Sequence, residues 1–125
     1  MNTDKAQIVE IGETNFESEV LRSKQPVLVA FLAPWSRPCQ TVKSVLDEVA
    51  TACLGMVKVV KVNVDNNPDL GLWYEIQSIP TLLYFAGGSL RTKVVGTASK
   101  EAILSQLQLI SHGDDSTSLI SDPKK

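Results

Sequence analysis

The stretch that most constrains the fold of this chain is a continuous apolar run at residues 26–32. It is rich in β-branched side chains, and no charged or polar residue interrupts it. A short strand of this composition is buried on both faces, as the central strands of parallel sheets are. The run therefore predicts an α/β fold in which helices cover both faces of a sheet.

Other strand patterns recur along the chain, and segments of helical periodicity separate most of them. Strands separated by helices pair in parallel through right-handed crossovers. The Gly87-Gly88 turn, in contrast, predicts that the last two strands are antiparallel. The predicted strands cover residues 7–11, 26–32, 57–64, 82–85 and 90–95.

The helices are predicted from their caps and apolar stripes. Thr14 and Glu17 have the spacing of a capping box, which predicts a helix over residues 14–22. Apolar side chains recur at helical spacing over residues 42–53, and a short helix is predicted over residues 67–74. A last helix begins after Ser99. The predicted order is β-α-β-α-β-α-β-β-α, with a central mixed sheet flanked by helices.

The length of 125 residues is sufficient for one domain. Residues 111–125 are mostly polar and have little periodicity, so we expect a domain over residues 1–110 and a flexible tail over residues 111–125. The formal net charge of −2 gives no electrostatic case for a nucleic-acid partner. The longest apolar stretch is far shorter than the ~20 residues that span a membrane, so we expect no membrane partner.

Few residues are available for metal or nucleophilic chemistry. The chain has only two cysteines, Cys39 and Cys53, which form no disulfide framework and fit a reducing compartment. The first five residues lack the basic-then-apolar layout of a secretory signal, so we expect a cytoplasmic protein. Because the single histidine, His112, lies in a polar region, we expect no metal, no cofactor and no Cys–His catalysis.

Several motifs together resemble the thioredoxin family over roughly residues 8–110. Their order and spacing are more specific than any one of them alone. The resemblance implies a thioredoxin fold and a link to cell redox homeostasis. The matching segments are P-V-L-V-A-F-L-A-P-W, Pro38-Cys39, K-V-N-V-D-N-N-P, I-P-T-L-L-Y-F, Gly88 and Gly96.

The resemblance also implies a peptide-binding groove. Trp35, Ile79 and Gly96 match positions that line this groove, and Pro80 matches the family's proline with a preceding cis peptide bond. Two alternatives stay open, namely that Trp35 is an incidental surface aromatic and that Gly96 is needed only for its backbone angles. The aromatic pair at residues 73–74 is expected to pack in the protein rather than to recognise a partner.

The chain departs from the family pattern at two positions. In the segment W-S-R-P-C, Ser36 stands at the position of the family's attacking cysteine, and a hydroxyl cannot form a disulfide. We interpret Ser36 as a helix N-cap rather than a catalytic serine, because no histidine is available as its base. Ala30 stands where the family has a buried, proton-carrying aspartate. Lys61, which the family places near that acid, must find another partner or reach water.

Cys53 cannot supply the missing thiol. If both cysteines lie on one helix, the 14 positions between them correspond to ~21 Å along its axis. A disulfide tolerates Cα separations of only ~4.4–6.8 Å. Cys53 also continues an apolar stripe, which predicts a buried packing role. Cys39 is therefore the only candidate catalytic thiol, and the sequence leaves open whether it is inert or slowly reactive.

Three functions are compatible with these residues. The first is a module that binds extended polypeptide clients in the groove and has lost autonomous dithiol–disulfide turnover. The second is a monothiol oxidoreductase, in which Cys39 forms a mixed disulfide with glutathione or a client. If Ser36 is an engineered replacement of cysteine, the parent is an ordinary thioredoxin. The third is a structural domain whose tail links it to a partner.

Overall fold

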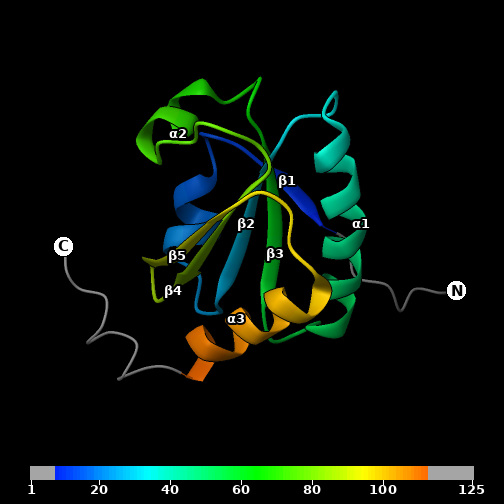
Figure 1. Ribbon diagram of the computed structural model, residues 1–125. Helices are drawn as coiled ribbons and strands as arrows, with labels where there is room; N and C mark the ends of the chain where they lie inside the picture. Colours follow the sequence, from blue (N-terminus) through cyan, green and yellow to red (C-terminus); the bar gives the residue numbers. More distant parts are fainter. Residues whose placement is uncertain (1–7, 113–125) are drawn as a thin grey trace, which may run out of the picture.

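A five-stranded sheet forms the centre of the computed structural model, which describes residues 8–112 (Figure 1). Two parallel pairings join β1 and β2 to β3, whereas β4 runs antiparallel to both β2 and β5. The spatial order is β1-β3-β2-β4-β5, so the predicted mixed sheet is confirmed. The strands are β1 (Val9–Ile11), β2 (Val27–Leu32), β3 (Lys58–Asn63), β4 (Thr81–Ala86) and β5 (Ser89–Val95).

Helices cover both faces of the sheet (Figure 1). The long helices α1 and α3 pack on one face, whereas η1, a π-helix, and the short α2 pack on the other. Within residues 8–112, no helix is long and apolar enough to cross a membrane. The predicted element order is confirmed. The helices are η1 (Glu17–Leu21), α1 (Arg37–Ala52), α2 (Pro68–Trp73) and α3 (Lys100–His112).

The apolar run at residues 26–32 contains β2, and all six residues of this strand are buried. Alternate side chains point to opposite faces of a strand. Leu28 and Ala30 therefore belong to the core under α1 and α3, whereas Val29 and Phe31 belong to the core under η1 and α2. Because β2 lies between β3 and β4, it fixes the position of the loop that follows it.

The predicted capping box is wrong. The first helix begins at Glu17, and no side chain caps its N-terminus. Asn15, between the two predicted capping residues, instead accepts a hydrogen bond from the Gly12 N–H through Oδ1 at 2.8 Å. Its carbonyl also accepts one from the Glu19 N–H at 2.9 Å. Short polar side chains commonly bond to nearby backbone in this way, and here that bonding stabilises a turn before the helix.

Two helix ends also differ from their predicted positions. Helix α3 continues to His112, two residues past the expected end at residue 110, and α2 ends at Trp73, one residue early. The remainder of the predicted tail, residues 113–125, lies outside the described residues. So do residues 1–7 of the predicted domain.

Burial of Tyr84, whose exposed fraction is 1%, raises the pKa of its phenol from about 10 to about 12. The unfolded chain therefore loses this proton at a lower pH than the folded protein does. The contribution of this pKa shift to the free energy of unfolding is fully present below about pH 10 and is lost as pH rises towards 12. At 1.36 kcal/mol per unit, we expect a loss of about 1.4 kcal/mol between pH 9 and pH 11. In urea unfolding, Tyr84→Phe should lose less of its free energy of unfolding than the wild type does over this pH range. Equal losses in the wild type and Tyr84→Phe would contradict the assignment of this pH dependence to Tyr84.

Candidate functional site

The candidate site lies where β2 ends and α1 begins. The loop at residues 33–36 joins these two elements. Phe31, near the end of β2, pairs in register with Thr81, the first residue of β4. The loop and the Ile79-Pro80 segment that precedes β4 therefore lie at the same edge of the sheet.

Ser36 caps the N-terminus of α1, as predicted. Its backbone is extended, with φ −93° and ψ 123°, and its Oγ accepts a hydrogen bond from the Cys39 N–H at 3.3 Å. Its carbonyl accepts a second bond from the Gln40 N–H at 3.1 Å. The first bond satisfies an amide of the first helical turn that otherwise lacks a partner, and the second is the first i→i−4 bond of the helix itself. The serine hydroxyl therefore has a structural role at this position.

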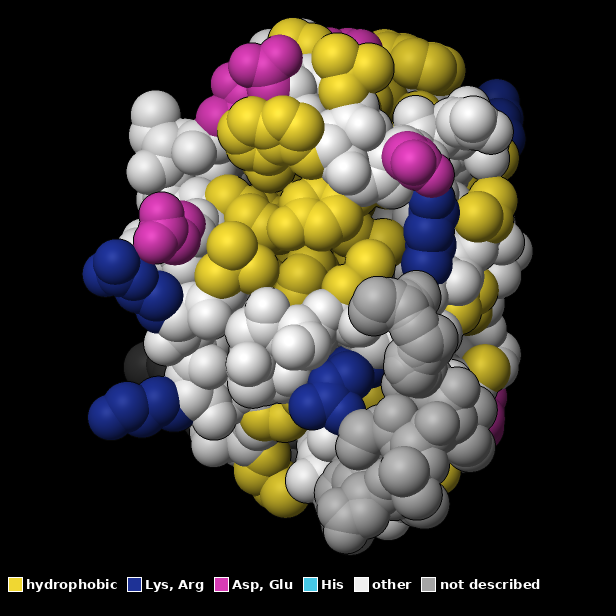
Figure 2. Space-filling view, turned by 90° about the vertical axis from the view of Figure 1, so that its left-hand side faces the viewer, with side chains coloured by type: hydrophobic (Ala, Val, Ile, Leu, Met, Phe, Trp, Pro, Cys, Tyr) yellow, Lys and Arg dark blue, Asp and Glu magenta, His cyan; other side chains and the backbone are white. Residues whose placement is uncertain are grey.

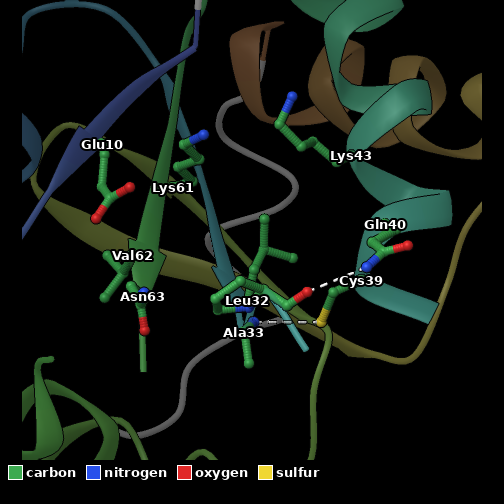
Figure 3. Close-up of a pocket in the computed structure, with 10 residues that line it drawn as sticks. Glu10, Leu32, Ala33, Cys39, Gln40, Lys43, Lys61, Val62 and Asn63 are labelled. Atoms are coloured by element: carbon green, nitrogen blue, oxygen red, sulfur yellow. Dashed lines mark hydrogen bonds between the residues drawn. The ribbon is translucent and has the colours of Figure 1, made fainter. Parts of the chain in front are cut away.

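Cys39 lies in the first turn of α1 and is 3% exposed. Its Sγ accepts a hydrogen bond from the Ala33 N–H at 3.5 Å, which ties the thiol to the loop after β2 (Figure 3). The side chain belongs to the core under α1 and α3. The thiol is thus held in one place, beneath the loop that carries Ser36.

Cys53 is at the opposite end of α1, where it is the C-terminal cap residue. A helix of 16 residues is about 24 Å long, so the two thiols cannot bond to each other in the folded chain. Both are free. Burial raises the pKa of the Cys53 thiol. The side chain is only half-buried, so the predicted burial is incomplete, but it packs against the core under α1 and α3 as expected.

The four residues assigned to the groove lie around this edge of the sheet. Trp35 is 69% exposed, and its indole Nε1–H donates to Oδ2 of Asp65 at 2.9 Å. Ile79 is half-buried and Pro80 is buried, with a cis peptide bond between them. The Gly96 N–H donates to the Pro80 carbonyl at 2.8 Å, which joins the end of β5 to this segment. Gly96 has φ 99°, so its backbone angles alone already favour glycine.

The prediction for the aromatic pair at residues 73–74 is half wrong. Tyr74 packs as expected, with its ring centroid 5.4 Å from that of Phe16 and 5.8 Å from that of Phe85. Trp73, in contrast, is 67% exposed, beside the equally exposed Leu72. Figure 2 shows the side of the molecule that carries α2, β4 and β5, where hydrophobic side chains form a broad patch. A helix as short as α2 buries only one narrow stripe, so neighbouring apolar residues remain outside it.

A pocket of about 210 Å³ lies between the start of α1 and the adjoining strands β1, β2 and β3 (Figure 3). Cys39 lines it from α1, together with Gln40 and Lys43. From the sheet, Lys61 and Glu10 face the same space. Lys61 was expected to need a new partner or water, and it extends into this pocket. Within residues 8–112, no group of three or more metal-binding side chains is present.

A sequence profile of the Thioredoxin family matches residues 7–109. The chain belongs to the thioredoxin family. It is 45% identical over 101 residues to "Thioredoxin" of Griffithsia pacifica, which covers 81% of this chain and 93% of that protein. It is 46% identical over 99 residues to "Thioredoxin 1" of Nostoc sp., covering 79% and 92% respectively. The predicted thioredoxin fold and the link to redox homeostasis are thereby confirmed for this thioredoxin-family chain.

Proposed function

We propose that this thioredoxin-family protein binds extended polypeptide clients and does not turn over disulfides by itself. The observation that carries the proposal is the pair of groups at the start of α1, a capping hydroxyl at Ser36 and a single thiol at Cys39. Disulfide turnover within one chain needs two thiols that can meet. The second thiol of this chain, on Cys53, lies at the far end of a 16-residue helix. We propose a cytoplasmic location, because both thiols are free.

Contacts at the edge of the sheet support the binding role. The hydrogen bond to Asp65 holds the exposed Trp35 ring in one orientation, so little side-chain freedom is lost when a client packs on it. Val95, at the end of β5, is also exposed, and Ile79 is half-buried. An apolar surface beside the ends of strands suits an extended peptide. Such a peptide forms hydrogen bonds with exposed backbone groups and packs its side chains on the apolar surface.

The expected result is binding without catalysis. Insulin reduction by dithiothreitol should be no faster with the protein than without it, because no internal dithiol can form. A reduced and carboxymethylated polypeptide, which is unfolded and has no thiols, should bind. Trp35→Ala should weaken this binding by about tenfold, the effect of removing a typical aromatic anchor. Calorimetry or fluorescence anisotropy would measure the affinity.

Trp73→Ala is the matched control, because Trp73 has almost the same exposure but lies on α2. It should leave the affinity unchanged. Accelerated insulin reduction would contradict the loss of turnover. Equal affinities for the wild type and Trp35→Ala would contradict the groove.

A second candidate function is monothiol exchange through Cys39, with glutathione or a client as the other partner. The observation that favours it is that Cys39, although buried, lines the pocket beside α1. A mixed disulfide formed there would need an external thiol to resolve it, because Ser36 cannot.

A further inference from the structure

The pocket between α1 and the sheet has charges and dimensions that indicate a ligand class. We propose that it admits one half of a small, carboxylate-bearing disulfide and presents the sulfur of that ligand to Cys39. This proposal rests on the monothiol function described above and names the substrate class of that reaction.

Two ammonium groups flank the pocket on opposite sides. Lys61 reaches it from β3, and its neighbours in register are Glu10 on β1 and the uncharged Ala30 on β2. Among the described residues 8–112, no carboxylate oxygen lies within 4.0 Å of the Lys61 Nζ. The Lys61 ammonium is therefore not engaged in an ion pair within this part of the chain, and a ligand carboxylate can contact it directly.

Lys43 reaches the pocket from α1, one turn after Cys39 (Figure 3). It forms an ion pair with Asp47 at 3.5 Å, and both side chains are exposed. Exposed pairs of this kind contribute little to stability. Lys43 can therefore turn from Asp47 to a ligand carboxylate at low cost. Glu10 is the single carboxylate in the pocket lining, against two lysines.

The volume limits the size of the ligand. At about 210 Å³, the pocket is smaller than the ~300–1,000 Å³ of sites for drug-sized molecules. A small mercaptocarboxylate fits this space. Leu32 supplies an apolar wall for its methylene groups.

The reaction is one thiol–disulfide exchange. The Cys39 thiol loses its proton to water, and its sulfur attacks the nearer ligand sulfur. A bond forms between the two sulfurs while the ligand S–S bond breaks, and the other half leaves as a thiolate with the electron pair. An external small thiol then attacks the mixed disulfide, which releases Cys39 in its reduced form and leaves the external thiol in a new disulfide.

Two disulfides of equal chain length but opposite charge test the proposal, namely dithiodipropionate and cystamine. Their rates of adduct formation are measured by intact-mass spectrometry in a Cys53→Ser background. The ratio of the dithiodipropionate rate to the cystamine rate is determined for the folded protein. It is then divided by the same ratio for the protein unfolded in urea, where the pocket is absent. We expect dithiodipropionate to be favoured about fivefold in the folded protein, as partly solvated charge pairs would produce. Lys61→Gln should bring the ratio close to one.

Lys24→Gln is the matched control. It removes the same charge from an exposed lysine that precedes β2, at the edge of the sheet opposite to Cys39. It should leave the ratio unchanged. Equal rates for the two disulfides, or a ratio that survives Lys61→Gln, would overturn the pocket assignment and leave monothiol exchange standing. No adduct at Cys39 with either disulfide would overturn both.

Discussion

Ser36→Cys is expected to accelerate the reduction of insulin by dithiothreitol, which the wild-type protein should not do. On the proposed function, this single oxygen-to-sulfur change restores a thiol that can meet Cys39. Residues three apart in a helical turn have Cβ atoms ~5–6 Å apart, and a disulfide needs ~3.5–4.5 Å, so a small adjustment suffices. The oxidised variant should be two hydrogens lighter than the reduced one.

The start of α1 also makes the new thiol reactive. The Ser36 Oγ accepts the Cys39 N–H at 3.3 Å, and a sulfur in its place would face the same donor and the positive end of the helix dipole. Such a site lowers a thiol pKa from ~8.5 towards ~7, which raises the thiolate fraction at pH 7 by up to about 15-fold. Insulin turbidity and intact mass are the two measurements.

Ser36→Ala distinguishes the effect of adding a thiol from the effect of losing the helix cap. It removes the oxygen that accepts from Cys39 and should cost about 1 kcal/mol of stability, without any gain of insulin reduction. If Ser36→Cys neither forms the disulfide nor reduces insulin, the loss of turnover has a cause other than the missing thiol.

Much of the fold follows from local sequence. The uninterrupted apolar run predicts that β2 is buried on both faces, and all six residues are. The alternation in β3 places Lys61 on the same face as Val59, and Lys61 lines the pocket under α1 while Val59 joins the core there. The first turn is predicted less well. Asn15 and Thr14 can both bond to backbone, and only the tertiary position of the turn decides which one does.

The site is predictable only in part, for a similar reason. Serine before a helix predicts the cap at Ser36, because that bond involves residues three apart. The pocket depends instead on the register of three strands, which places Glu10, Lys61 and Ala30 side by side. No local pattern contains that register. Charged residues at inward positions of otherwise apolar strands are the one signal that could have indicated it.

Ala30→Asp is expected to destabilise the protein strongly at neutral pH. Ala30 is fully buried in β2, paired with Lys61 on one side and Leu82 on the other. A carboxylate at this position loses its hydration, and a buried charge without an adequate partner costs about 3 kcal/mol or more. Lys61 is only half-buried and extends towards the pocket, so it offsets part of this cost. Urea unfolding at pH 7 measures the difference from the wild type.

The pH dependence identifies the charge as the cause. Burial raises the pKa of the new carboxyl group in the folded protein above its unfolded value of ~3.9. The penalty is therefore complete above the folded pKa and disappears as pH falls through the folded pKa to the unfolded one. Ala30→Asn has a similar shape but cannot ionise, so its cost should not vary with pH in this way. Equal costs for the two variants at every pH would mean that size, not charge, keeps this position small. A penalty confined to Ala30→Asp at higher pH would instead mean that this chain gains stability by lacking a proton-carrying acid beneath Cys39.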